Sequence, residues 1–481
     1  MFGNTWNGII RSVSTVDASN QPYDVIVVGG GNAALVAAIS ARHHAERVLV
    51  LERAPEWIRG GNSRHTRDIR ASHDGCGIYT DGIYPEAELL DDLVRVGGGR
   101  DNLDLAKLVV RESRTLFPWM TDHGVRWQQP LQGTLNLNRT NLFFLGGGKA
   151  LMNTYYQTAQ RMGVEVRYDA CVSDLLLAEN RTEGVIAEIG GQTVTLRSRA
   201  VVVASGGFEA NIGWLKEYWG EAADNFVIRG TPYNDGRVLR SLLDAGAQPV
   251  GDPQGFHAVA VDGRAPQFDG GIVTRLDSVP FGIALNQQGE RFYDEGEDFW
   301  PKRYAIWGGM IARQPGQIAY SIFDARMLDR FMTSLYRPFQ ADTIPGLATA
   351  LGLDPERVLA TVQTYNAHAG LESAFDPAVL DGCATTDLTP PKSHWAMPIL
   401  EPPFYGYPLR PGITFTYRGL AVDELTRVQM VNGRPMENLY AAGEIMAGNV
   451  LSSGYLAGFG LTLGTVFGRI AGTEAAKHGR D

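Results

Sequence analysis

A glycine-rich turn near the start of the chain limits the fold more than any other feature. The apolar, β-branched run 23–28 leads directly into three glycines at 29–31, and an alanine-rich helical pattern follows at 32–42. A second short apolar run then ends at Glu52. Strand, glycine turn, helix and strand in this order predict a βαβ unit, in which the free N–H groups of the helix start bind a pyrophosphate.

The residues of this unit have separate expected roles. Gly29 allows the tight turn, Gly31 lets the backbone approach a pyrophosphate closely, and Ala34 is small enough for the helix to pack on the strand. Glu52 stands at the end of the second strand, where an acid binds the hydroxyl groups of an unphosphorylated ribose. The cofactor contacts expected from this unit are Gly29, Gly31, Asn32, Ala33, Ala34, Glu52 and Arg53.

Three later segments favour FAD over NAD as the cofactor. The segment 60–63 reads Gly-Gly-Asn-Ser after the second strand, and another apolar strand ends in a glycine pair within 204–208. Near the C-terminus a strand runs into Gly443 and Glu444, and a helix start follows near 458–461. A helix N-terminus there would stabilise negative charge on a reduced flavin, and a simple NAD dehydrogenase has no need of it. These segments add Gly61, Asn62, Ser63, Val172, Ala204, Ser205, Gly206, Gly443, Glu444, Gly460 and Leu461 to the expected cofactor contacts.

The chain reads as an α/β protein whose cofactor domain is interrupted. Between 251 and 414 the pattern changes to short strands, irregular helices and clusters of aromatic residues and prolines. Before this region, a single helical pattern covers 103–120, and strand-like runs occur at 193–196 and 200–204. We expect a Rossmann-like FAD-binding domain of the glutathione-reductase type with an inserted α+β capping domain. The expected division is an extension at 1–22, the FAD-binding domain at 23–250 and 415–481, and the cap at 251–414.

Composition excludes several classes of protein. The net charge of −10 is spread over 481 residues without a basic run, which argues against nucleic acid as a partner. The three cysteines have neither metal nor disulfide spacing, so we expect no metal and a reducing, cytoplasmic location. Residues 1–22 contain no apolar signal segment. The uncharged stretch 445–468 contains six glycines and several polar residues, so it predicts a buried helix and loop rather than a membrane protein.

Taken together, these motifs resemble the flavoprotein family of fumarate reductase, succinate dehydrogenase and 3-ketosteroid Δ1-dehydrogenase. The resemblance runs from about Asp24 to Lys477. The motifs at 60–67, 289–296, 415–417 and 448–451 are most similar to the tricarballylate dehydrogenase subfamily. The resemblance implies an enzyme that holds its substrate between FAD-binding domain and cap. It also implies hydride transfer from a saturated C–C bond of a tricarballylate-like acid to flavin N5, giving the alkene.

The resemblance also suggests residues for this chemistry. His257 falls at the family histidine that holds a substrate carboxylate, and Arg303 follows the segment that precedes the proton-transferring arginine of fumarate reductase. The spacing before Arg303 is longer here, so Lys302 or Tyr304 are alternatives for that position. The expected catalytic residues are His257, Arg303 and Tyr417, and the expected substrate contacts are Arg64, His65, Arg67, His257, Tyr417 and Tyr455.

Two departures from the family pattern concern substrate binding. Phe415 replaces a family histidine, and the segment 452–458 lacks the arginine of the fumarate reductase motif. Tyr417 is therefore a candidate acid, base or hydrogen-bond donor. The motif around His65 is closer to relatives that bind FAD non-covalently, so we expect a non-covalent cofactor.

Two alternative functions remain open at this point. One is an enone or ketosteroid-type Δ1-dehydrogenase or ene-reductase, which would favour tyrosines and apolar residues over clustered arginines in the pocket. The other is an electron-transferring subunit with a separate partner. No cysteine cluster for an iron–sulfur centre occurs in the chain, so such a relay would belong to another protein.

Overall fold

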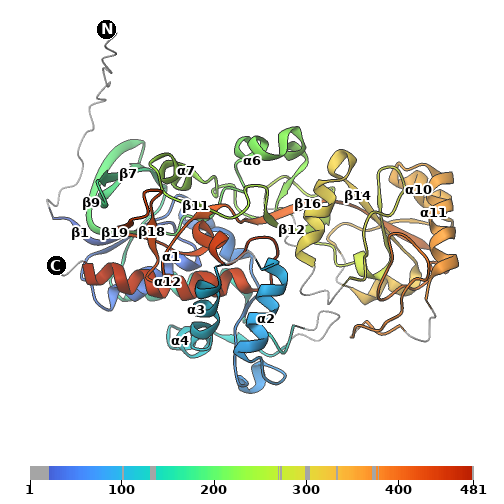
Figure 1. The fold of residues 1–481 in the computed structure, drawn as a ribbon, viewed down its shortest axis with the longest axis horizontal. Coiled ribbons are helices and arrows are strands. Elements are labelled where there is room, and N and C mark those ends of the chain that lie inside the picture. The colour runs from blue at the N-terminus through green and yellow to red at the C-terminus, as the bar shows by residue number, and fades with distance from the viewer. Residues whose placement is uncertain are drawn as a thin grey trace, which may run out of the picture.

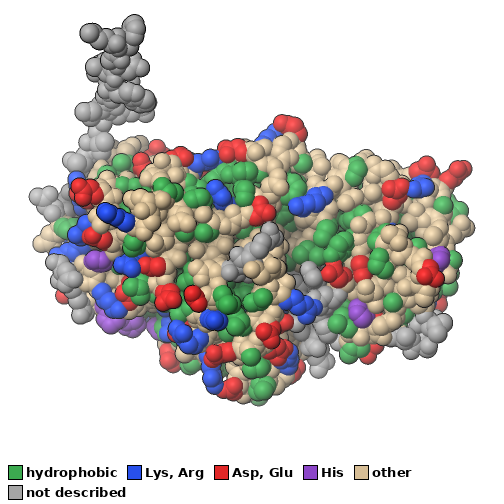
Figure 2. Space-filling model, in the orientation of Figure 1, with side chains coloured by type: hydrophobic (Ala, Val, Ile, Leu, Met, Phe, Trp, Pro, Cys, Tyr) green, Lys and Arg blue, Asp and Glu red, His purple; other side chains and the backbone are tan. Residues whose placement is uncertain are grey.

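The computed structural model describes residues 21–99, 102–130, 137–268, 270, 274–297, 304–331, 334–370, 375–377 and 379–478. Two main sheets organise these described residues (Figure 1). The first sheet contains the N-terminal and C-terminal strands, and the second contains strands from the middle of the sequence. Acidic and basic side chains are interspersed on the face shown in Figure 2.

The first sheet has five parallel strands in the order β19-β9-β1-β2-β6. Their apolar residues are almost fully buried, as expected for a parallel sheet covered on both faces. β18 pairs antiparallel with β19, and β7 and β8 form an antiparallel extension of β9. The bounds are β1 Tyr23–Val28, β2 Val48–Leu51, β6 Glu165–Arg167, β7 Ala170–Ala178, β8 Arg181–Ile189, β9 Gln192–Val203, β18 Arg427–Gln429 and β19 Pro435–Ala441.

Helices α1 (Asn32–Arg42) and α12 (Phe459–His478) pack closely against each other beside this sheet (Figure 1). The close approach depends on glycines of α12. A Cβ atom at Gly468 would lie 2.7 Å from the carbonyl oxygen of Ala33, and one at Gly472 would overlap the backbone of Ala37. Segments from the two ends of the sequence therefore form one unit.

The second sheet is built around the long strand β16 (Phe404–Thr416). β12, β14 and β15 pair antiparallel with β16, β10 pairs parallel with it, and β13 pairs with β14. Helices α9, α10 and α11 accompany this sheet, and two separate apolar clusters form its core. The bounds are β10 Val227–Ile228, β12 Phe256–Asp262, β13 Ile283–Asn286, β14 Ala319–Phe323, β15 Phe339–Ala341, α9 Trp307–Ala312, α10 Ile344–Leu351 and α11 Pro355–His368.

The remaining elements cover the first sheet or connect the two sheets. Strands β3, β5 and β4 form a small third sheet, and β11 pairs with β17. Their bounds are β3 Asp68–Arg70, β4 Trp127–Gln128, β5 Asn141–Phe144, β11 Pro249–Val250 and β17 Gly419–Leu420. The helices are α2 Glu86–Gly97, α3 Leu103–Ser113, α4 Leu116–Asp122, α5 Gly147–Arg161, α6 Ile212–Trp219 and α7 Arg237–Asp244.

The structure confirms the α/β fold and the βαβ unit and corrects two element boundaries. The helical pattern at 103–120 is interrupted, because α3 ends at Ser113 and α4 begins at Leu116. Pro118 explains the break, since it lacks the N–H that would donate to the carbonyl of Arg114 in a continuous helix. The runs 193–196 and 200–204 belong to one strand, β9, whose polar residues at 197–199 continue the alternation.

The second sheet lies largely in the region expected to form the cap, and the division of the chain at 251 and 414 stays a prediction. β10 joins the second sheet before residue 251, and β16 continues through residue 414 to Thr416. The uncharged stretch 445–468 is largely buried, as predicted. Among the described helices, none has the length and apolarity needed to cross a membrane.

Candidate functional site

A cavity of about 570 Å³ opens at the carboxyl ends of β1, β2 and β9, between the two sheets. This edge is where ligands bind in open α/β sheets. Of the expected cofactor contacts, all except Ala34 line it: Gly29, Gly31, Asn32, Ala33, Glu52, Arg53, Gly61, Asn62, Ser63, Val172, Ala204, Ser205, Gly206, Gly443, Glu444, Gly460 and Leu461. Ala34 is fully buried in α1 behind this surface.

The glycine turn after β1 leaves no room for side chains on its inner side. Gly29 has a φ of 109°, and a Cβ atom there would overlap the carbonyl oxygen of Ala204. A Cβ atom at Gly30 would overlap the carboxyl group of Glu52 and the hydroxyl group of Tyr156. At Gly31 the nearest atom to a Cβ would be Ser63 Oγ at 3.5 Å, an ordinary contact, so a Cβ atom there would fit against the protein but occupy part of the cavity.

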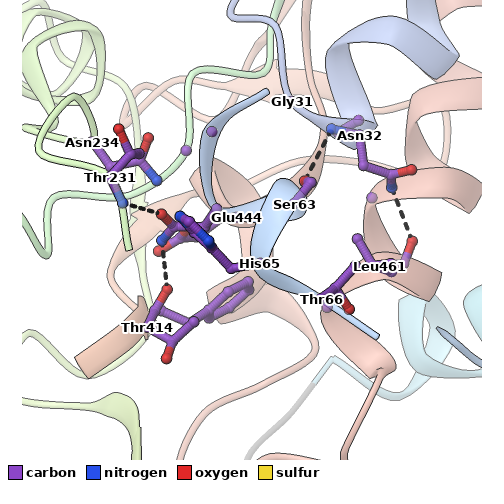
Figure 3. A pocket seen from close by; sticks show the side chains of 18 of the residues that line it. Gly31, Asn32, Ser63, His65, Thr66, Thr231, Asn234, Thr414, Glu444 and Leu461 are labelled. Carbon is purple, nitrogen blue, oxygen red and sulfur yellow. Dashed lines mark hydrogen bonds between the residues drawn. The ribbon is translucent and has the colours of Figure 1, made fainter. Parts of the chain in front are cut away.

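Asn32 fixes the start of α1 against the loop after β2 and against α12 (Figure 3). Its backbone N–H donates to Ser63 Oγ at 3.0 Å. Its side-chain amide donates to the carbonyl oxygen of Leu461 at 3.2 Å and to Thr465 Oγ1 at 3.0 Å. Two helix N-termini are thereby held at one cavity, and the N–H groups of a helix start favour an anion.

Glu52 lies at the end of β2 and is 5% exposed. Its Oε1 accepts a hydrogen bond from the N–H of Ala54 at 2.8 Å. Burial raises the pKa of this carboxyl group above its ordinary value, and the backbone donors oppose the increase. The neighbouring Arg53 forms an ion pair with Asp235 at 2.6 Å. A buried acid in this position agrees with recognition of ribose hydroxyl groups.

Asn62 connects three segments that are distant in the sequence. Its Nδ2 donates to Glu209 Oε1 at 2.7 Å and to the carbonyl oxygen of Thr414 at 2.9 Å. Its Oδ1 accepts a hydrogen bond from the N–H of Thr231 at 2.9 Å. The sequence identified Asn62 from its glycine-rich motif, whereas Glu209 and Thr231 lie in segments that carry no motif for this contact.

His257 and Tyr455 form a stacked pair on the cavity, with ring centroids 4.0 Å apart and planes 3° apart. Burial lowers the pKa of His257 well below 6.5, and the positive charges of Arg229 and Arg275 lower it further. The imidazole is therefore neutral at pH 7. Tyr455 Oη accepts a hydrogen bond from the N–H of Gly460 at 2.9 Å, which fixes the ring against the start of α12.

Sequence reasoning missed two arginines beside this pair. Arg229 and Arg275 line the cavity, and each is about 9% exposed. Arg229 donates to Thr414 Oγ1 at 3.2 Å, and Arg275 pairs with Asp277 at 2.6 Å. Neither arginine belongs to a recognisable motif, and the fold brings both to His257 from other segments. The expected substrate contacts His65 and Arg67 also line the cavity.

Other expected site residues lie elsewhere. Tyr417 is 1% exposed and lies outside the cavity lining, because β16 ends at Thr416 and the tyrosine ring packs on Gly255. Arg64 lines a separate pocket on the outer side of η2 (Gly61–His65). Arg303 and the alternative Lys302 lie outside the described residues, as does the side chain of Tyr304. Within the described residues, no group of His, Cys, Asp or Glu side chains is arranged to hold a metal.

The residues of the cavity fit FAD. The glycine turn leaves space where a Cβ atom would intrude, the starts of α1 and α12 can bind anionic groups, and Glu52 can accept from ribose hydroxyls. His65 lines the same cavity, and non-covalent attachment of the cofactor stays a prediction.

Comparisons with known proteins agree with this geometry. The family model described as "FAD binding domain" matches residues 24–461. The chain is 27% identical to NADH:fumarate oxidoreductase from Klebsiella pneumoniae, over 96% of this chain and 48% of that protein. It is 25% identical to 3-oxosteroid 1-dehydrogenase from Mycobacterium tuberculosis, over 89% of this chain and 93% of that protein. The chain thus spans about half the length of the first of these relatives.

Two solved structures show the same fold. The open conformation of a flavocytochrome c3 fumarate reductase superposes with a TM-score of 0.73 at 22% identity, over 96% of this chain and 80% of that one. A 3-ketosteroid-Δ4-(5α)-dehydrogenase from Rhodococcus jostii RHA1 also gives a TM-score of 0.73 at 22% identity, over 96% of this chain and 99% of that one. The predictions of FAD and of a flavin-dependent oxidoreductase fold are confirmed. The chain belongs to the FAD-binding domain family, whose relatives named here are oxidoreductases of C–C bonds.

Proposed function

We propose that the chain is an FAD-dependent oxidoreductase that dehydrogenates a saturated C–C bond beside a carboxylate, giving the alkene. The proposed substrate class is a polycarboxylic acid of the tricarballylate type. The observation that carries this proposal is the set of Arg229 and Arg275 around the stacked His257–Tyr455 pair on the cofactor cavity. His65 and Arg67 add further basic groups to the same cavity.

The two arginines have the chemistry to bind substrate carboxylates. A guanidinium group is always charged and can bind a carboxylate through two parallel hydrogen bonds. Thr414 holds Arg229 in place, and Asp277 holds Arg275. Less side-chain conformational entropy is therefore lost when the substrate binds. Substrates with several carboxylates would use both arginines, and Arg67 lines the same cavity.

His257 and Tyr455 would act on the substrate as neutral groups. A neutral imidazole can donate or accept one hydrogen bond, and the phenol of Tyr455 can donate while it accepts from Gly460. Bound FAD would supply the hydride acceptor of the reaction. The two arginines would stabilise the negative charge that develops beside the carboxylate when the neighbouring carbon loses its proton. Arg303 stays the prediction for the proton-transferring residue, and the position of Tyr417 gives no support for a catalytic role.

A second candidate function is an enone or ketosteroid dehydrogenase. Phe331, Phe415 and Tyr455 line the cavity together with the basic residues, and one relative is a 3-oxosteroid 1-dehydrogenase. The phenol of Tyr455 could polarise a substrate carbonyl as well as it could bind a carboxylate. The two arginines favour the acid, because a guanidinium group binds a charged carboxylate more strongly than the carbonyl of an uncharged enone.

A separate electron-transfer partner is part of this proposal. Reduced FAD must pass its electrons on before the next turnover, and one relative, from Shewanella frigidimarina, is named fumarate reductase (cytochrome). We propose that another protein or a diffusible acceptor removes the electrons from this chain.

An assay of the holoenzyme with an artificial electron acceptor tests the substrate class. Tricarballylate, succinate and a 3-ketosteroid are compared at equal concentration. We expect turnover with tricarballylate, weaker turnover with succinate because one carboxylate contact is lost, and none with the steroid. Turnover with the steroid and with neither acid would contradict the proposal and favour the second candidate function.

A further inference from the structure

Two glutamates, Glu209 and Glu444, form a carboxyl pair in the wall of the cavity. Glu209 follows β9 and is fully buried, and Glu444 lies in the first turn of η10 (Gly443–Asn449) and opens onto the cavity. The two carboxyl groups are close enough to shift each other's pKa. Figure 3 labels Glu444 together with His65, which lines the same cavity.

Fixed donors already occupy one oxygen atom of each carboxyl group. Glu209 Oε1 accepts from Asn62 Nδ2 at 2.7 Å and from Asn234 Nδ2 at 2.8 Å. Glu444 Oε1 accepts from the N–H of Thr416 at 2.8 Å and from Thr416 Oγ1 at 3.3 Å. Glu209 Oε2 is buried and receives no hydrogen bond from the N–H or O–H donors of the described residues. A hydrogen bond between two carboxyl groups requires a proton, because an ionised carboxylate can only accept.

Within the described residues, no Lys, Arg or His side chain forms an ion pair with either glutamate. The facing residues are the neutral Asn62 of η2, Asn234 of the loop before α7, and Thr416 of β16. Among the charged groups on these elements, Asp235 pairs with Arg53, Arg229 donates to Thr414, and Arg64 lines a separate pocket. His65 lines the same cavity as Glu444 and forms no ion pair with it.

Burial raises the pKa of both carboxyl groups. The charge of Glu209 raises the pKa of Glu444 further, whereas the interaction with Glu444 lowers the pKa of Glu209. Two carboxyl groups in contact cannot both be ionised at little cost, so they share one proton and titrate as a unit.

We propose that Glu209 and Glu444 are a positioning pair that couples proton uptake to reduction of bound FAD. The pair keeps its shared proton beside reduced FAD and loses it at alkaline pH beside oxidised FAD. The physical cause is that reduced FAD carries more negative charge, which opposes a second carboxylate charge in the same wall. In the alkaline range an external reductant supplies two electrons and solvent supplies one proton to FAD. Solvent supplies one further proton to the pair, which changes from a dianion to a monoanion.

The reduction potential of the holoenzyme, measured from neutral to alkaline pH by dithionite titration with a reference dye, tests this coupling. When reduction takes up one additional proton for two electrons, its equilibrium constant changes tenfold per pH unit. The reduction potential then changes by about 30 mV more per pH unit. We expect this extra slope at alkaline pH in the wild-type protein. Glu209→Gln keeps the acceptor oxygen for both asparagines and provides a permanent donor to Glu444, so we expect the extra slope to disappear. Glu188→Gln, on the exposed side of β8, is the matched control and should keep it.

Equal slopes in the wild-type protein and in Glu209→Gln would overturn the proposal. If that variant does not retain FAD, the wild-type protein alone still decides the question. In weakly buffered alkaline solution with an indicator dye, reduction should remove one more proton from solvent per FAD than at neutral pH. An unchanged proton count would overturn the proposal. Neither measurement uses a substrate, so the result is independent of the proposed reaction.

Discussion

At the scale of single residues, the site is defined by where the fold places its positive charges. Arg229 and Arg275 are buried beside His257, and their charges help to keep its imidazole neutral. A neutral histidine cannot replace a guanidinium group as the counter-charge of a carboxylate. We therefore assign anion binding to the arginines and orientation to the stacked His257–Tyr455 pair.

We expect Arg275→Gln to weaken binding of tricarballylate by about 2 kcal/mol, roughly thirtyfold, because a charged hydrogen-bond donor is lost in a buried site. The dissociation constant is measured from the change in the flavin spectrum on binding to the holoenzyme. Arg197→Gln, whose exposed side chain pairs with Glu183 on the β8–β9 hairpin, is the control. Equal affinity in wild-type protein and Arg275→Gln would remove Arg275 from the substrate site.

The pKa of His257 predicts a pH dependence of stability. The unfolded histidine titrates near 6.5, and the folded one is depressed below this value, chiefly by burial. The unfolded state then binds more protons as the pH falls below 6.5, so this contribution to the free energy of unfolding decreases at acidic pH. Chemical denaturation of the wild-type protein and of His257→Asn is compared from neutral to acidic pH. The free energy of unfolding should decrease more for the wild-type protein than for His257→Asn over this range. Equal decreases would contradict a lowered pKa of His257.

At the scale of elements, the cofactor cavity depends on the contact between α1 and α12. Asn32 bonds to Leu461 and Thr465, and glycines along α12 allow the two helices to approach. The interface between α1 and α12 thus fixes the relative positions of the two helix N-termini that face the cavity. A change at this interface should affect FAD binding even though it is remote from the cofactor.

We expect Gly472→Ala to separate α12 from α1, because its Cβ atom would overlap the backbone of Ala37. Overpacking of this kind costs about 1–3 kcal/mol. Gly213→Ala in α6 is the matched control, since its Cβ atom meets nothing closer than 3.4 Å and alanine favours a helix. Flavin fluorescence during heating reports the temperature of FAD release. Only Gly472→Ala should lower it, and an unchanged release temperature would contradict the role of this interface.

The elements that the sequence predicts correctly are those with local signals. The glycine turn, the strand ends and the start of α12 each have a sequence pattern within a short segment. These motifs therefore predict most of the residues that line the cofactor cavity. Arg229 and Arg275 carry no such signal, because the fold brings them to the cavity from segments far away in the chain. Glu209 carries none either, and it is placed behind the cavity by its bond to Asn62. Tyr417 stays a prediction from its motif: it follows Phe415 by two residues, but β16 ends at Thr416 and the tyrosine lies outside the cavity lining.

At the scale of the whole molecule, the cavity lies between the mainly parallel first sheet and the mainly antiparallel second sheet. The first sheet supplies the cofactor contacts, and residues of the second sheet and its loops supply His257, Arg275 and Phe331. Asn62 joins the two sheets by bonding to Thr414 of β16. In the proposed function, the substrate would lie between the cofactor and the second sheet, where access of water to the reacting bond would be limited.

The most direct test of the proposed reaction is an anaerobic titration of the yellow holoenzyme with tricarballylate, followed by its visible spectrum. A polycarboxylate dehydrogenase should transfer a hydride to FAD, so we expect bleaching of the flavin band until the cofactor is fully reduced. An unchanged spectrum, in a protein whose flavin dithionite can still reduce, would contradict the proposed reaction.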